Sequence, residues 1–404
     1  MARNLIAVLS VALVAACDSG SSGDSDASSS TGSSGGDTSA DSDGSGTTGT
    51  PSTSATAGTN PGTTDDGTTS DDASGGESSS TGAEPEGVPV VVSLAHGGQT
   101  ARSCDGGQTW SDFHDFGIQD DHSDYAAFAG LTYGNGVFVG ATGWGAPAHV
   151  LRSTDGITWE DAGDDAFVTD KGSARPQNGS SGVEFVGDGF VLFAGPEMWR
   201  SDDGLVWTAS TPPSLAFSGH FREVEYLAGP DLLLIATEDY ETPQSWLVQV
   251  SADGGESWQT GTGATAACVG YVQHNGGFAT YDGRLLLAGG DGPTCVSDDG
   301  GLTWSEAGNV GAPIADVEAT DDGFVVLTAA GEVLTSADAV TWTPLGSAGV
   351  QEGRIGWSDG FFGESGGVYV HSADGATWAD AAGTPPKGFG GVREFAVGHI
   401  PSCP

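Results

Sequence analysis

The stretch Ser153-Thr154-Asp155-Gly156-Ile157-Thr158-Trp159 recurs in variant form seven times along the sequence. In each copy an aspartate follows a serine by two residues, and a tryptophan follows that aspartate after four or five more. Glycine comes directly after the aspartate in six copies, and Ala339 replaces it in the sixth. The seven aspartates are Asp105, Asp155, Asp203, Asp253, Asp299, Asp338 and Asp374.

This pattern indicates a tight turn that leads into a strand. An aspartate side chain accepts hydrogen bonds from backbone N–H groups just ahead of it and so closes the turn locally. Glycine adopts positive φ angles at little steric cost, and the tryptophan supplies a large apolar surface for packing. Seven such turns far apart in the chain indicate one supersecondary unit used seven times.

The spacing of the copies agrees with four-stranded units. Steps between successive tryptophans are 49, 48, 51, 46, 38 and 36 residues, near the roughly 40–45 residues of a propeller blade. Helical solenoids have similar periods, but these repeats lack helical periodicity and contain short apolar runs such as Val137–Val139 and Phe324–Leu327. Asn135-Gly136 and Asp282-Gly283 precede such runs and predict hairpin turns between strands 1 and 2.

The combined Ser, Asp, Gly and Trp signature resembles the Asp-box (BNR) repeat of sialidase-like β-propellers over residues 88–404. The resemblance implies an all-β, seven-bladed propeller in which each box lies on the turn between strands 3 and 4, away from the ligand-binding face. The first repeat begins with strand 2 at Val90, while residues 391–398 are similar to strand 1 of other repeats. We therefore expect the C-terminal strand to complete the first blade and remove the open edges of the ring.

Four of the five cysteines lie in the repeat region and allow three pairings. On the topology that the resemblance implies, Cys104 in the first box and Cys403 after the closing strand lie on one face of one blade. Cys268 and Cys295 lie together on the opposite face of the fifth blade. We therefore expect Cys104–Cys403 and Cys268–Cys295 disulfides, which suit an oxidising compartment. The alternatives are free buried thiols or a metal site, and the latter lacks a CxxC or Cys–His spacing.

The N-terminus predicts export and a lipid anchor. Residues 1–16 combine Arg3 with an apolar run too short for the roughly 20 residues that span a bilayer. The run ends in Leu-Val-Ala-Ala before Cys17, which resembles a bacterial lipobox and implies lipidation of Cys17. An ordinary signal peptide with an incidental cysteine is the alternative. Residues 17–87 hold thirteen acids and no Lys or Arg, a composition that predicts a disordered linker.

The chain is strongly acidic, with a formal net charge of −44. With the thirteen linker acids and Arg3 set aside, 42 acids and 10 basic residues remain, a net charge of about −32. This field argues against nucleic acid and anionic membrane surfaces, and it favours cationic partners or divalent ions. Solubility alone is the alternative explanation.

Long connections in repeats 2 to 4 indicate a ligand-binding rim around the channel mouth, although loops that vary without binding anything are the alternative. The acidic, histidine-containing segment 113–124 matches no known metal-binding loop, so we expect a solvated loop and no metal site. We likewise expect no cofactor. The candidate rim residues are His122, Trp144, Arg175, His220, Arg222, Tyr240, Arg354 and Arg393.

Two functions fit this sequence. The first is a monomeric, non-catalytic scaffold for a protein or glycan, similar to propellers of the photosystem assembly-factor type. The second is a sialidase-like glycoside hydrolase, because Arg222, Arg354 and Arg393 near the starts of strands 1 would suit a substrate carboxylate. Sialidases have six blades and a Phe-Arg-Ile-Pro motif, which is absent here, and Glu223 and Glu394 sit beside two of the arginines. We therefore predict the scaffold and assign no catalytic residue.

Overall fold

A computed structural model describes residues 87–95, 98–116, 129–142, 148–169, 172–173, 175–176, 180–211, 221–239, 245–265, 268, 276–349, 353–365, 367–385 and 391–403. All of them belong to the compact unit Ser78–Pro404. The linker and Cys17 lie outside the described residues. Among the residues described, no helix is long and apolar enough to cross a membrane.

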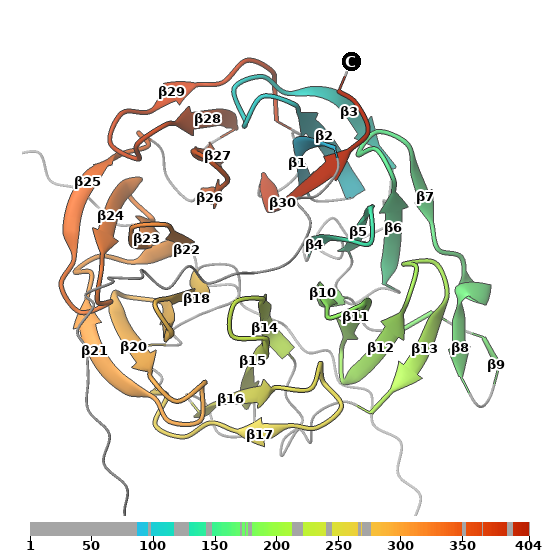
Figure 1. The fold of residues 1–404 in the computed structure, drawn as a ribbon, viewed down its shortest axis with the longest axis horizontal. Coiled ribbons are helices and arrows are strands. Elements are labelled where there is room, and N and C mark those ends of the chain that lie inside the picture. Colours follow the sequence, from blue (N-terminus) through green and yellow to red (C-terminus); the bar gives the residue numbers. More distant parts are fainter. Residues whose placement is uncertain are drawn as a thin grey trace, which may run out of the picture. The chain divides into compact units, whose positions relative to one another are not determined.

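Seven antiparallel sheets radiate around one axis, and each sheet is one blade (Figure 1). The prediction of a seven-bladed propeller is confirmed. Within a blade the strands run from the axis outward in sequence order, except in blade 1 and at the outer edge of blade 3 (Figure 1). The inner two strands of blades 1 to 7 are, in turn, β30 (Val392–Ile400) and β1 (Val88–Ala95), β4 (Ala129–Gly134) and β5 (Val137–Thr142), β10 (Ser180–Val186) and β11 (Gly189–Ala194), β14 (Phe221–Leu227) and β15 (Leu232–Asp239), β18 (Gly276–Tyr281) and β19 (Arg284–Gly289), β22 (Ile314–Thr320) and β23 (Gly323–Thr328), and β26 (Arg354–Trp357) and β27 (Phe361–Ser365).

The outer two strands of each blade flank the box turn. In the same order they are β2 (Gln99–Ser103) and β3 (Ser111–Asp115), β6 (His149–Ser153) and β7 (Trp159–Asp161), β12 (Glu197–Ser201) and β13 (Trp207–Ser210), β16 (Ser245–Ser251) and β17 (Gln259–Thr260), β20 (Pro293–Ser297) and β21 (Ser305–Asn309), β24 (Glu332–Ser336) and β25 (Thr343–Ser347), and β28 (Val368–Ser372) and β29 (Ala379–Asp380).

The C-terminal strand closes the ring as expected. β30 pairs antiparallel with β1 from Val88↔Ile400 to Ala95↔Val392, so blade 1 is built from both ends of the domain. The Cys104–Cys403 disulfide joins the same two ends, with its Cα atoms 6.0 Å apart. Cys268 and Cys295 form the second expected disulfide, with Cα atoms 5.5 Å apart. Both predicted pairings are confirmed.

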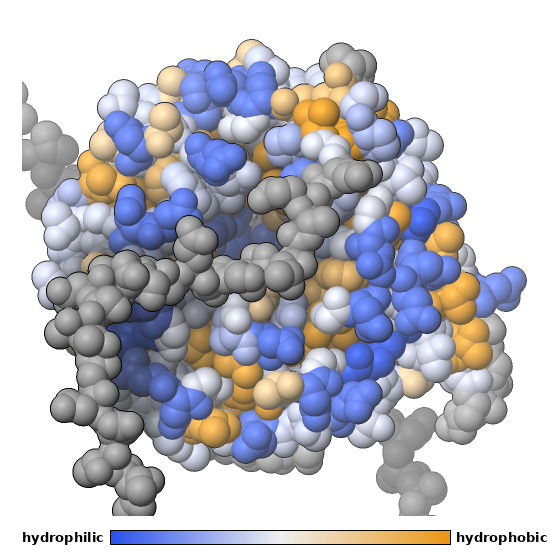
Figure 2. Space-filling view, viewed as in Figure 1, coloured by the Kyte–Doolittle hydropathy of each residue, from blue (hydrophilic) through white to orange (hydrophobic). Residues whose placement is uncertain are grey.

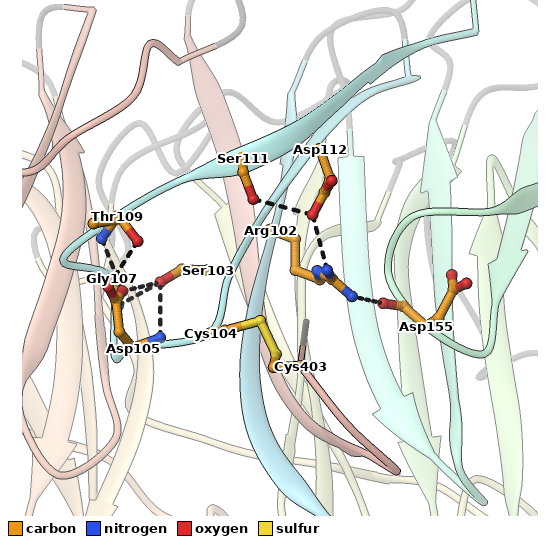
Figure 3. Close-up of a disulfide and its surroundings, with 10 residues drawn as sticks. All are labelled: Arg102, Ser103, Cys104, Asp105, Gly107, Thr109, Ser111, Asp112, Asp155 and Cys403. Carbon is orange, nitrogen blue, oxygen red and sulfur yellow. Dashed lines mark hydrogen bonds and ion pairs between the residues drawn. A yellow bond between two sulfur atoms is a disulfide. The ribbon is translucent and has the colours of Figure 1, made fainter.

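The box turns have the hydrogen bonds that their sequence predicts. In the first box the Asp105 carboxylate accepts from the Thr109 amide at 2.8 Å and from its hydroxyl at 2.7 Å (Figure 3). The Ser103 hydroxyl donates to Asp105 at 2.9 Å and accepts from the Gly107 amide at 2.9 Å. Each turn thus holds its own shape through short-range bonds, as at the other six aspartates.

The core of the domain lies between blades rather than within them. Each of the seven hydrophobic clusters in the described residues draws side chains from two neighbouring blades. At the closing junction the box tryptophan Trp110 of blade 1 stacks on Tyr369 of blade 7, with ring centroids 4.1 Å apart. Because every blade covers its neighbour, a closed ring leaves no blade face exposed.

One insertion differs from the predicted arrangement. Arg175 is predicted at the channel mouth, but the strands that precede it, β8 (Phe167–Thr169) and β9 (Gly172–Ser173), extend the outer edge of blade 3 (Figure 1). A short 3-10 helix, η2 (Asp164–Ala166), precedes them. β8 pairs parallel with β13, and Phe167 is fully buried against Trp199 and Trp207. Burial of this phenylalanine fixes the insertion on the periphery.

Candidate functional site

The innermost strands of blades 6, 7 and 1 bring charged residues together near the axis. Strand registers place Asp316, Arg354 and Glu394 at equivalent positions, opposite Leu327, Glu364 and Leu94 of their own blades. Blades 2, 3 and 5 carry Gly130, Gly182 and Gly277 at this position. We call Asp316, Glu318, Arg354 and Glu394 the inner-strand cluster.

Asp316 and Arg354 fasten blade 6 to blade 7. Arg354 donates from Nη1 to Asp316 Oδ1 at 3.0 Å, and the Ile355 amide donates to Oδ2 at 2.8 Å. At the equivalent junction of blades 2 and 3, Gly130 allows the next strand to come close, because a Cβ there would lie 2.7 Å from the Val183 nitrogen. At the junction of blades 6 and 7 the strands are therefore joined through the aspartate carboxylate, by one ion-paired hydrogen bond and one hydrogen bond from a backbone amide.

Glu318 and Glu394 are the carboxyl groups of the cluster other than Asp316, which is paired with Arg354. Both are partly accessible. Burial raises the pKa of Glu318 well above its usual range, and the nearby charges of Asp316 and Glu394 raise it further. Burial also raises the pKa of Glu394 to about 7, although Arg354 opposes the shift. Among the side chains that the structure describes, Arg354 is the cation that acts on both Glu318 and Glu394, and it is paired with Asp316. These two carboxyl groups can therefore take up a proton or a positively charged ligand.

The raised pKa of Glu394 predicts a pH dependence of stability. Between its usual pKa near 4.5 and about 7, the folded chain holds a proton that the unfolded chain has lost. The free energy of unfolding should therefore fall as pH rises through this window, by up to about 1.4 kcal/mol per pH unit for one proton. Glu394→Gln should flatten the fall in urea unfolding measured from pH 4.5 to 7.5.

The control for this prediction is Glu256→Gln, which removes the same charge from an exposed residue of the fourth box turn. It should leave the slope unchanged. An unchanged slope in Glu394→Gln would show that Glu394 does not titrate in this window.

The described basic side chains are all used within the chain. Four of them, which we call the arginine bridges, donate to a backbone carbonyl in the box turn of a following blade. The other two, Arg175 and Arg354, make ion pairs with Asp164 and Asp316. The bridges are Arg102 to Asp155 at 3.0 Å (Figure 3), Arg152 to Asp203 at 2.7 Å, Arg200 to Gly254, and Arg284 to Asp338 at 3.0 Å.

Two of the predicted rim residues have described side chains. Arg175 donates to Asp164 at 2.5 Å and to the Ala162 carbonyl at 3.0 Å, and so ties the insertion before blade 3 to blade 2. Arg354 belongs to the inner-strand cluster. The structure places Arg222 on β14 and Arg393 on β30 but describes neither side chain, and His122, Trp144, His220 and Tyr240 lie outside the described residues. The predicted rim stays a prediction.

The box aspartates serve the turns. In Asp253 the Ser257 hydroxyl and amide, together with the Ser251 hydroxyl, lower the pKa to about 2. In Asp155 burial raises the pKa, but bonds from Thr158, Ile157 and Ser153 outweigh it and lower the pKa overall. An acceptor already occupied by three or four donors is not available to act on a substrate. Within the described residues, no group of His, Cys, Asp or Glu side chains is arranged to hold a metal ion.

Comparison with known proteins shows the fold. No protein-family model matches the chain, and no curated protein matches it. A GH74 xyloglucanase from Xanthomonas campestris is similar at a TM-score of 0.51 and 16% identity, over 77% of this chain and 52% of that one. A structure of YCF48 bound to D1 peptide gives a TM-score of 0.47 and 20% identity, over 68% and 86% of the two chains. A mutant Trypanosoma rangeli sialidase displaying trans-sialidase activity gives 0.35 and 12%, over 62% and 52%.

At 16% identity the xyloglucanase shows the propeller fold alone. Because one fold supports many functions, the function of this chain depends on the residues of its own sites.

Proposed function

We propose that this chain is an exported, lipid-anchored propeller that acts as a non-catalytic binding scaffold for a cationic segment of a protein or glycan. Cys17 carries the lipid, residues 17–87 form the linker, and residues 88–404 form the binding domain. The two disulfides and the lipobox-like sequence both support a location outside the cytoplasm.

The distribution of charge carries the proposal. Every basic side chain that the structure describes is bonded to an acid or a carbonyl of its own chain, so none of these six is left to hold an anionic ligand. By contrast, Glu318 and Glu394 are partly accessible, and the whole chain has a net charge of −44. Such a surface attracts cations and repels anions.

A glycoside hydrolase is the second candidate, and one observation favours it. Burial raises the pKa of Glu394 to about 7, a value that suits a general acid near neutral pH. The charge of Asp316 raises the pKa of Glu394, and the charge of Glu394 raises the pKa of Glu318. The sialidase form of this candidate is weakened because Arg354, one of its three proposed carboxylate ligands, is paired with Asp316 at 3.0 Å.

A binding experiment separates these functions. The full-length protein is titrated by calorimetry with hexalysine, glucosamine oligomers, xyloglucan oligosaccharide and sialyllactose, and the same protein is assayed with fluorogenic glycosides. We expect salt-sensitive binding of a cationic probe and no turnover. Glu318→Gln/Glu394→Gln should weaken that binding roughly hundredfold, as expected for two charge-assisted contacts of about 1.5 kcal/mol each.

The matched control is Glu197→Gln/Glu256→Gln, which removes two exposed glutamates from blades 3 and 4. An equal loss of binding in this control would show a diffuse charge effect rather than a site. Glycoside turnover that disappears in Glu394→Gln would replace the scaffold with the hydrolase.

A further inference from the structure

Three of the four arginine bridges share one position, which Val250, Val296, Thr335 and His371 hold in blades 4 to 7. Arg102, Arg152 and Arg200 each occupy the residue before the box serine, opposite Val92, Val139 and Val191 of strand 2. The residue at the same register in blade 7 is His371, which pairs with Phe362 and Ala379. A histidine is shorter than an arginine and lacks its fork of donors.

A groove lies beside His371, on the side of blade 7 that faces the first box turn. It has a volume of about 500 Å³ and runs between the box-turn ends of blades 7 and 1. Its lining includes His371 and Ala379 from blade 7, Asp359 and Gly360 from the hairpin turn of that blade, and Asp105 and Gly106 from the first box.

Space around the box glycines confirms the difference between junctions. A Cβ on Gly156 would lie 3.2 Å from Arg102 Cδ, and one on Gly204 would lie 3.6 Å from Arg152 Cδ, so the arginine stems cover these turns. The equivalent Gly107 has all three of its nearest atoms in Phe362, and no atom lies within 4 Å of a Cβ on Gly106. At the first box turn Phe362 takes the place of the arginine stem against Gly107, and Gly106 is left open.

We propose that this groove binds an arginine side chain of a partner protein, which takes the place that Arg102, Arg152 and Arg200 fill at their own junctions. The guest guanidinium donates to the Gly106 carbonyl, the counterpart of the Gly254 carbonyl that Arg200 reaches in the fourth box, which has the same length. The neighbouring Asp105 carbonyl accepts from the exposed Gln108 amide at 3.0 Å and has a second lone pair as a further acceptor.

The groove also contains a carboxylate that could pair with the guest arginine, as two of the arginine bridges pair with an acid of their own blade. Arg102 pairs with Asp112 and Arg152 pairs with Glu160, each at 2.8 Å. At the closing junction strand 4 has Ala379 opposite His371, and the exposed Asp359 carboxylate lines the groove instead. A guanidinium suits this mixture of carbonyl and carboxylate acceptors better than an ammonium, because its donors form a fixed planar fork.

This site is separate from the inner-strand cluster. Asp359 lies in the turn after β26, whereas Arg354 lies at the start of that strand. The proposal therefore does not rest on the proposed function, and Glu318→Gln/Glu394→Gln should leave the groove intact.

The test is an NMR titration of the full chain with the peptide acetyl-Gly-Arg-Gly-amide and with its lysine counterpart. We expect saturable shifts of the Gly106 and Gly360 amides with the arginine peptide at millimolar concentration, as one anchoring side chain allows. The lysine peptide should bind about fivefold or more weakly, because it cannot form the bidentate contact. Asp359→Asn should weaken the arginine peptide severalfold.

The decisive variant is His371→Arg, which supplies the chain's own arginine, should fill the groove and should raise the melting temperature. It should abolish the shifts, whereas Thr335→Arg, the same change at the same register of blade 6, should retain them. Absence of saturable binding, an equal response in His371→Arg, or equal binding of the lysine peptide would each overturn the proposal.

Discussion

Removing the closing disulfide by Cys104→Ala/Cys403→Ala is expected to lower the free energy of unfolding by about 3–5 kcal/mol. The bond links positions 299 residues apart, so it restrains nearly the whole domain in the unfolded state. It also joins the two ends of the domain that pair in blade 1, where the ring closes. Denaturant unfolding under non-reducing conditions measures the change.

The loss of the closing disulfide should destabilise one region of the domain before the others. Hydrogen exchange is expected to rise first in β1 and β30, because these strands are the seam at which the ring opens. The control Cys268→Ala/Cys295→Ala removes a bond that spans 27 residues within blade 5 and should leave exchange in β1 and β30 unchanged. Uniform loss of protection, or a loss of less than about 1 kcal/mol, would show that β30 closes the ring without help from the disulfide.

Asp203→Ala is expected to destabilise the domain by about 2–4 kcal/mol. The carboxylate accepts from the Leu205 amide at 2.8 Å, the Val206 amide at 3.0 Å and the Ser201 hydroxyl at 3.1 Å. Removing it leaves these donors without the group that shapes the turn into β13. The neighbouring variant Asp202→Ala removes an exposed aspartate from the same turn and should change stability by no more than about 0.5 kcal/mol.

This prediction also has a definite pH dependence. Burial alone would raise the pKa of Asp203, but bonds from Val206, Leu205 and Ser201 lower it overall from 3.8. A lowered pKa stabilises the fold above the unfolded value and loses that contribution as pH falls through the folded value. The gap between wild type and Asp203→Ala should therefore narrow in acid below about pH 4. A constant gap would mean that the side chain acts through shape rather than charge.

The fold could be predicted because the turns that define it are held by residues close together in the sequence. An aspartate that closes its own turn needs only residues within four positions, so the seven boxes are visible in the sequence. The hairpin at Asn135-Gly136 is similar, since both residues have positive φ angles of 50° and 77°. The two cysteine pairings then followed from the topology that the resemblance implied.

The features that sequence reasoning missed depend on contacts between distant residues. β8 is only three residues long, and its parallel pairing with β13 becomes evident only when Phe167 is seen buried against Trp207. Asp316, Arg354 and Glu394 come together through the registers of three separate blades. Glu394 was noted in the sequence beside Arg393, and acids within otherwise apolar inner strands were the available signal.

Peptide mapping of the native protein, purified from membranes without reduction, tests the central claim most directly. Trypsin separates the four disulfide cysteines onto peptides 103–152, 223–284, 285–354 and 394–404. The closed, exported and lipid-anchored propeller predicts that 103–152 is linked to 394–404, that 223–284 is linked to 285–354, and that Cys17 is the acylated N-terminus. Free thiols, a different pairing, or an intact residue 1–16 segment joined to an unmodified Cys17 would contradict it.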